Sequence, residues 1–182
     1  MIRIVLLLVN IIFAYSASAQ ITMSSALKAM PDSLLVYLTE NNRLDCIDFC
    51  EAGMKAEVRN ALDGKSEMEV LTDHYALIQL SEACQVELCL LDGVGEQTIC
   101  MVSTYGTQLK ESSIRFFTSS WLPLSTCEHI TLPDWMFTAK LDENEQTICL
   151  TRQTAIDRPA LEGQTEYEIL QRNLKWDSQK FK

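Results

Sequence analysis

The spacing of apolar residues changes near residue 65, and this change constrains the fold more than any other feature. Before it, apolar residues recur every three or four positions, as at Leu44, Ile47 and Cys50, which is the spacing of one helix face. After it, apolar and polar residues alternate, and β-branched and aromatic residues become common between turn-forming residues. The chain is therefore predicted to be an α+β domain, with helices first and antiparallel strands afterwards.

The part before residue 65 predicts short helices. One or two turns over residues 24–30 end at a proline, and an aspartate and a serine then offer caps for an apolar helix over residues 32–38. Residues 40–42 interrupt this pattern. A further short helix over residues 44–53 ends at a glycine, and a third helix is expected over residues 54–62, most of which also fit a strand.

The alternating part predicts an antiparallel meander. The turn Asp92-Gly93-Val94-Gly95 should join two of its strands as a hairpin. Strands are expected at residues 68–70, 75–80, 86–91, 98–102, 113–118, 147–152 and 167–176. The expected architecture has N-terminal helices packed on a largely antiparallel β-meander sheet of about six to eight strands, with its other face open for binding.

Residues 1–19 are typical of a cleavable signal peptide. Arg3 precedes an apolar run that is too short to span a bilayer of roughly 30 Å, and the small residues Ala17 and Ala19 follow. Cleavage is therefore expected near Ala19. The mature chain, residues 20–182, is then predicted to be one exported α+β domain without a transmembrane segment, periplasmic or secreted.

The mature chain is strongly acidic. Removal of Arg3 from the 15 basic residues leaves 14 against 25 acidic ones, a formal net charge of −11. Such a charge repels nucleic acid and anionic lipid. The expected partner is therefore an unidentified protein or small-molecule ligand, and no nucleic acid.

Seven cysteines lie in the mature chain, and an odd number leaves at least one thiol unpaired within the molecule. Cys89 and Cys100 face each other if the hairpin is symmetric, so they are the leading candidates for a disulfide, the alternative being two buried thiols on one face. Cys46 and Cys50 lie one helical turn apart, and core packing is the favoured interpretation.

The sequence assigns no catalytic, cofactor-binding or metal-binding residue. Cys127-Glu128-His129 contains the residue types of a nucleophile and its base, but neighbours in a loop rarely point the same way. The acidic run at residues 142–145 lacks the spacing of a calcium loop and is predicted to be a solvated turn. No cofactor is therefore expected.

An aromatic segment beginning at Ile114 supplies the candidate partner surface. On a strand, Ile114 and Phe116 share one face, and Arg115 and Phe117 share the other, so both faces are apolar. Trp121 follows at the strand end, where a tryptophan either closes the edge of a core or anchors a ligand. Arg115, Phe117 and Trp121 are the residues expected to meet a partner.

One five-residue sequence, Glu-Gln-Thr-Ile-Cys, is repeated at residues 96–100 and 145–149. The repeat indicates either two related hairpins or similar strand chemistry reached independently, and the divergent flanking residues leave both interpretations open.

Five segments together form a recognisable pattern. They are Met30-Pro-Asp-Ser-Leu-Leu, Leu38-Thr-Glu-Asn-Asn-Arg-Leu-Asp45, Gly53-Met-Lys-Ala-Glu-Val58, Gly64-Lys-Ser-Glu-Met-Glu-Val-Leu-Thr-Asp73 and Ile99-Cys-Met-Val-Ser-Thr-Tyr-Gly106. On these segments the chain resembles a family of small secreted Bacteroidales proteins of unknown function. The resemblance implies a periplasmic or cell-surface setting in a Gram-negative anaerobe, where reduced thiols are favoured. It implies no functional residues.

These observations favour an exported, non-catalytic binding or assembly module. The alternative is a cysteine- or carboxylate-dependent enzyme of the cell envelope, with Cys127 and His129 as its thiol version.

Overall fold

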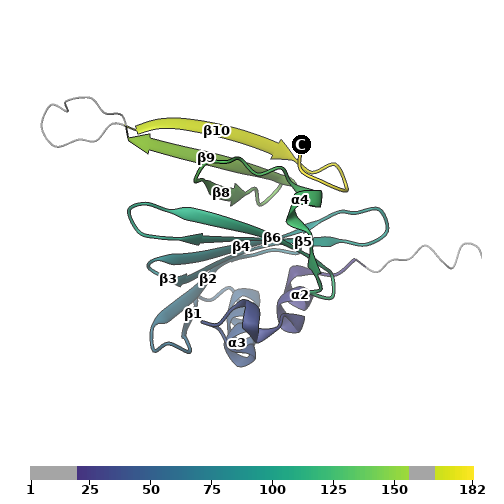
Figure 1. The fold of residues 1–182 in the computed structure, drawn as a ribbon. Helices are drawn as coiled ribbons and strands as arrows, with labels where there is room; N and C mark the ends of the chain where they lie inside the picture. The colour runs from purple at the N-terminus through teal and green to yellow at the C-terminus, as the bar shows by residue number, and fades with distance from the viewer. Residues whose placement is uncertain (1–19, 156–166) are drawn as a thin grey trace, which may run out of the picture.

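The computed structural model describes residues 20–155 and 167–182, which form three layers (Figure 1). Helices α2 (Met23–Ala29) and α3 (Glu40–Glu51) cover one face of a seven-stranded sheet, and a three-stranded sheet lies on the opposite side. The α+β class and the antiparallel meander are thereby confirmed.

Every strand of the large sheet pairs with its neighbour in sequence, and every pair is antiparallel. Its strands are β1 (Ala56–Arg59), β2 (Lys65–Leu71), β3 (Tyr75–Ser81), β4 (Cys84–Leu91), β5 (Thr98–Tyr105), β6 (Glu111–Thr118) and β7 (Pro123–Leu124). The small sheet has the order β10-β9-β8 and consists of β8 (Thr138–Leu141), β9 (Thr147–Ala155) and β10 (Tyr167–Lys175).

The helix predicted over residues 32–38 is wrong, because only a short 3₁₀ turn, η1 (Asp32–Leu34), forms there. Helix α3 instead begins at Glu40, within the segment 40–42 that was predicted to interrupt the helical pattern. Thr39 accepts a hydrogen bond from the Asn42 backbone N–H, and the Asn42 side chain accepts one from the Thr39 N–H. This reciprocal cap starts the helix despite its polar first turn.

Residues 54–62 contain an edge strand, β1, and no helix, so the strand alternative is the correct one. Gly53, at φ +66°, ends the preceding turn in the left-handed region, which turns the chain toward the sheet. Within the described residues, none of the helices, including the short α4 (Thr126–His129), has the length and apolar character needed to cross a bilayer.

The expectation of an open sheet face is wrong over β4, β5 and β6, because β8 packs against these strands. Alternating residues of the large sheet meet alternating residues of the small one in a second core, separate from the core under the helices. Its members include Cys89, Cys100, Val102, Ile114, Phe116, Leu141, Ile148, Leu150, Leu174 and Trp176. Burial of these apolar side chains stabilises the packing of the two sheets.

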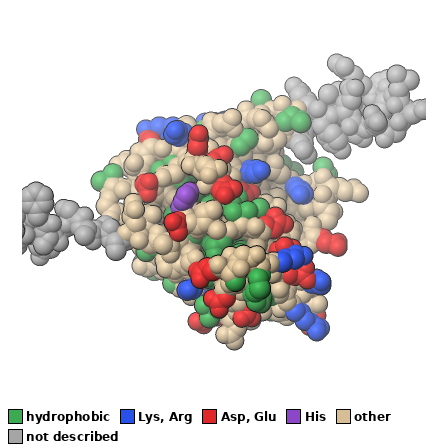
Figure 2. Space-filling view, turned by 180° about the vertical axis from the view of Figure 1, so that it is seen from behind, with side chains coloured by type: hydrophobic (Ala, Val, Ile, Leu, Met, Phe, Trp, Pro, Cys, Tyr) green, Lys and Arg blue, Asp and Glu red, His purple; other side chains and the backbone are tan. Residues whose placement is uncertain are grey.

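On β1 and β2 the large sheet carries charged side chains. Lys55 and Lys65 contact the Glu57 carboxylate at 2.8 and 2.6 Å, and their hydrogen bonds lower the pKa of Glu57 to about 2. Figure 2 shows acidic and basic side chains mixed in this region, at the lower right of the view. Paired charges of this kind suit a solvated rim.

The last three residues of each copy of the five-residue repeat begin β5 and β9, but equivalent residues face opposite sides in the two strands. In β5, Cys100 enters the core between the sheets and Ile99 faces the helices. In β9, Ile148 enters that same core and Cys149 is half-buried. Because equivalent residues point in opposite senses, the repeat reflects similar strand chemistry rather than duplicated hairpins.

Candidate functional site

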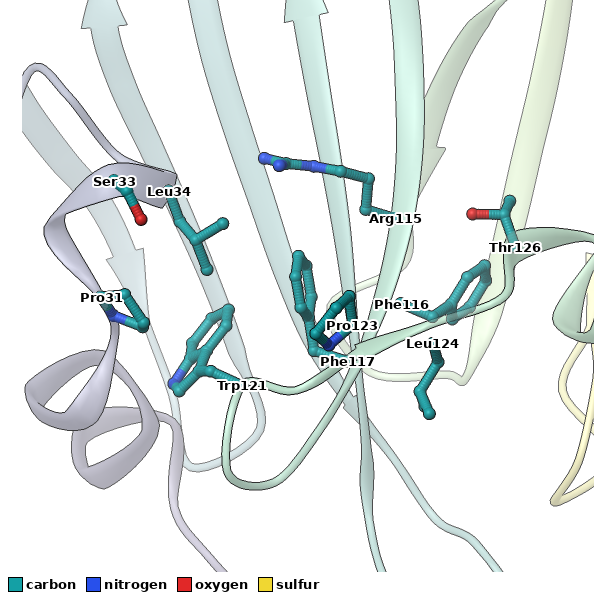
Figure 3. Close-up of a pocket in the computed structure, with 10 residues that line it drawn as sticks. All are labelled: Pro31, Ser33, Leu34, Arg115, Phe116, Phe117, Trp121, Pro123, Leu124 and Thr126. Atoms are coloured by element: carbon teal, nitrogen blue, oxygen red, sulfur yellow. The ribbon is translucent and has the colours of Figure 1, made fainter.

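A cleft of about 450 Å³ lies between the η1 segment and the β6–β7 edge of the large sheet (Figure 3). It is lined by Pro31, Ser33, Leu34, Arg115, Phe116, Phe117, Trp121, Pro123, Leu124 and Thr126. All three residues predicted as a partner surface, Arg115, Phe117 and Trp121, line this one cleft. The sequence did not predict the opposite wall formed by η1.

Arg115 and Phe117 reach the cleft because β6 alternates. Phe117 is buried in the core under the helices, and the exposed Arg115 guanidinium lies over its ring, 5.5 Å from the ring centroid. Figure 3 shows the Arg115 side chain extending above Phe117 toward Leu34. The Arg115 Nη2 also contacts the Met101 sulfur at 3.3 Å. The guanidinium is therefore held between an aromatic face and a thioether.

Trp121 closes the edge of the core under the helices, which is one of the two roles predicted for it, and it also lines the cleft. Its side chain is 5% exposed, packs 5.4 Å from the Phe117 ring and donates from Nε1 to the Ala26 carbonyl oxygen at 2.9 Å. Its backbone adopts φ +63°, a left-handed conformation that is uncommon for a bulky residue. These contacts close the edge of the core and fix the indole as one wall of the cleft.

Arg43 holds the η1 wall in place. It is 1% exposed on α3 and donates to the carbonyl oxygens of Leu27, Met30 and Leu38 at 3.1, 2.6 and 3.0 Å. Its Nη1 also pairs with Asp32 at 2.6 Å. Sequence reasoning missed this residue, although Arg43 shares a helical stripe with the buried Cys46 and Ile47.

Cys127 and His129 make no hydrogen bond with each other in the structure. The exposed Cys127 sulfur lies 3.1 Å from Ser125 Oγ. His129 Nδ1 contacts the Gln179 carbonyl oxygen at 2.9 Å, and its ring packs 5.0 Å from the Phe116 ring. His129 therefore anchors the C-terminal segment and is not positioned as a base for Cys127.

The register predicted for Cys89 and Cys100 is confirmed, because they are direct partners across β4 and β5. Both thiols are buried and unjoined in the structure. Burial raises the pKa of Cys89 to about 12 and that of Cys100 well above its ordinary value. The disulfide stays a prediction: after denaturation without reductant, five free thiols would support it, and seven would contradict it.

Native thiol reactivity should be dominated by Cys127. It is the exposed cysteine, whereas burial raises the pKa of Cys46 to about 11 and also raises those of Cys50 and Cys84. Labelling the folded protein with a chromogenic disulfide reagent should give one fast phase. Cys127→Ser should remove this phase, and its persistence would contradict the assignment.

Among residues 20–155 and 167–182, no group of three or more histidine, cysteine or acidic side chains is arranged to hold a metal ion. In the acidic run, Asp142 Oδ1 accepts from the backbone N–H groups of Asn144 and Glu145 at 2.8 and 2.7 Å. This carboxylate therefore organises a turn.

The layers and the cleft define a three-layer α+β domain with a largely apolar cleft at one sheet edge. The chain belongs to the family described as "Protein of unknown function (DUF3256)", whose model matches residues 14–178. A domain of an uncharacterized protein from Porphyromonas gingivalis W83 has a similar fold, with a TM-score of 0.69 and 20% sequence identity; the match covers 90% of this chain and 98% of that one. A comparison with curated proteins found no match.

Proposed function

We propose that this protein is an exported, non-catalytic binding module, and that the cleft between η1 and β6–β7 binds a small ligand with an apolar body. The proposal rests on one observation: η1, β6, the Trp121 turn and β7 converge on a single largely apolar cleft.

The size and lining of the cleft support a small ligand. A volume of about 450 Å³ is within the range typical of small-molecule sites. Phe117 and Trp121 offer aromatic surfaces whose positions are fixed by core packing, so little side-chain ordering is needed when a ligand binds. The hydroxyls of Ser33 and Thr126 supply polar groups at the rim.

The signal-peptide pattern of residues 1–19 supports the exported setting, periplasmic or secreted. The measurement that tests this is the mass of the protein isolated from its native cell. A mature amino terminus at Gln20 is the expected result, and an intact Met1 in the cytosol would contradict export.

Binding should depend on Leu124 and not on its neighbour Leu122. Leu124 is half-buried and lines the cleft, whereas Leu122 is 63% exposed and does not. With the neutral probe 4-phenylbutan-1-ol, Leu124→Asn should raise the Kd about fivefold, because a polar amide replaces part of the apolar wall. Leu122→Asn should leave the Kd unchanged. Titration can follow the indole N–H signal of Trp121 by NMR.

Two results would contradict the proposed site. One is the absence of any shift of the Trp121 signal at millimolar probe, and the other is an equal effect of the two asparagine variants. Turnover of a substrate that requires Cys127 would instead favour the enzyme alternative.

A further inference from the structure

Among the described residues that line the cleft, one side chain is cationic and none is acidic. Arg115 is the charged residue of this lining. The carboxylate of Asp32, the first residue of η1, pairs with Arg43 at 2.6 Å. The ion pairs among the described residues involve Arg43, Lys55, Arg59, Lys65 and Lys182, and none of them includes Arg115.

The two contacts of the Arg115 guanidinium leave most of its hydrogen-bonding capacity free. One is the Phe117 ring and the other is the Met101 sulfur, which is a weak acceptor. An arginine has five N–H donors in a planar fork that matches the two oxygens of a carboxylate. Held between these apolar groups, the fork is oriented before any ligand arrives.

We propose that the ligand of this cleft is a small monocarboxylic acid, whose apolar body lies against Trp121 and Phe117 and whose carboxylate pairs with Arg115. This inference deepens the proposed binding function and rests on it. A single arginine balances one negative charge. A dianion such as a phosphate monoester would keep excess negative charge in a chain whose formal net charge is −10 before processing.

The exposure of Arg115 determines how strongly the cleft should prefer a carboxylate to a neutral probe, and how that preference depends on salt. Because the guanidinium faces water, solvent screening reduces the gain from the ion pair. We expect 4-phenylbutyrate to bind about tenfold more tightly than 4-phenylbutan-1-ol, the neutral molecule with the same ring and chain length. The ratio should fall as ionic strength rises, since salt screens an exposed charge.

The test measures both probes at pH 7 on the wild type and on matched variants. Arg115→Gln should bring the two Kd values within about twofold, whereas Arg115→Lys should retain part of the preference because it keeps the charge and loses the fork. Arg172→Gln, which removes an exposed arginine on β10, should keep the full preference. Equal melting temperatures of the variants would show that folding is intact.

The outcomes separate this inference from the proposed function. If both probes bind equally to the wild type, the cleft is a binding site but the carboxylate assignment is wrong. If neither probe binds, the proposed function itself fails. Tighter binding of 4-phenylbutyl phosphate than of 4-phenylbutyrate would overturn the choice of a monoanion.

Discussion

Arg43→Met should lower the free energy of unfolding by about 3–5 kcal/mol, as expected when one partner of a buried charged network is removed. The methionine fills a similar volume but donates no hydrogen bond. The carbonyl oxygens of Leu27, Met30 and Leu38 would then lose donors in a buried site. Urea denaturation followed by circular dichroism measures the change.

Two matched variants isolate the cause of this loss. Arg59→Met removes an exposed arginine whose partner Asp63 is also exposed, and it should change stability by less than about 0.5 kcal/mol. Asp32→Asn removes only the charged partner of Arg43; that side chain is 61% exposed, so the cost should stay below about 1 kcal/mol. If Arg43→Met and Arg59→Met have the same free energy of unfolding, the hydrogen bonds of Arg43 do not stabilise the fold and the prediction is wrong.

Arg43→Met should also weaken binding in the cleft. Arg43 joins the end of α2 to η1 and α3, so its loss frees the segment through which Pro31 and Leu34 line the cleft. At a temperature where the variant remains folded, its Kd for 4-phenylbutan-1-ol should rise while that of Arg59→Met stays at the wild-type value.

The features that the sequence predicted correctly are local ones. The β4–β5 hairpin follows from two alternating runs around a glycine-containing turn, and this also fixed the Cys89–Cys100 register. Likewise, alternation along β6 predicts that Arg115 and Phe117 share one face of the strand. Two of the three residues predicted as a partner surface are therefore placed in the cleft by the two-residue period of the strand alone.

The features that sequence reasoning missed depend on distant contacts. The four residues of β8 carry too short a pattern to identify a strand, and only packing on β4, β5 and β6 shows that a second sheet covers the first. Arg43 was missed for the same reason, because its carbonyl partners are up to 16 residues away in sequence. The η1 wall of the cleft depends on that residue and was missed with it.

The sequence position of Glu87 could have identified it as a buried carboxylate. It stands between Val86 and Leu88 in a strand that is buried on both faces. Glu87 is 2% exposed, and its carboxylate lies between the two sheets. Oε2 accepts from the Tyr75 hydroxyl at 3.1 Å and from the Leu141 backbone N–H of β8 at 2.9 Å. Oε1 accepts from Gln85 at 3.2 Å. The carboxylate thus links the sheets.

Glu87 should make the protein less stable at neutral than at mildly acidic pH. Burial raises the pKa of Glu87, and the hydrogen bonds from Leu141 and Tyr75 and the charge of Lys140 oppose this only in part. Because the folded-state pKa exceeds the unfolded one, near 4.5, the folded protein binds the proton more tightly. The contribution is complete below the unfolded pKa and is lost as the pH rises through the folded pKa.

Glu87→Gln should remove this pH dependence. The glutamine oxygen can accept from Tyr75 and Leu141, and the Gln85 amide can turn to accept from the new amide group. The variant should therefore be more stable than the wild type at pH 7, and the difference should shrink toward pH 4.5. Glu57 and Asp177 have pKa values lowered to about 2, so they contribute a pH dependence of the opposite sense in both proteins. Their contribution cancels when the free energy of unfolding of the wild type is subtracted from that of the variant at each pH.

Glu87→Leu tests the hydrogen bonds apart from the charge. Leucine does not ionise, but it leaves the Tyr75 hydroxyl and the Leu141 N–H buried without their acceptor. The free energy of unfolding of Glu87→Leu should therefore be about 3 kcal/mol lower than that of Glu87→Gln at any pH. Glu67→Leu, on the charged rim of β2, is the control and should change stability little. Equal stabilities of the leucine and glutamine variants at residue 87 would show that apolar packing alone holds the two sheets together.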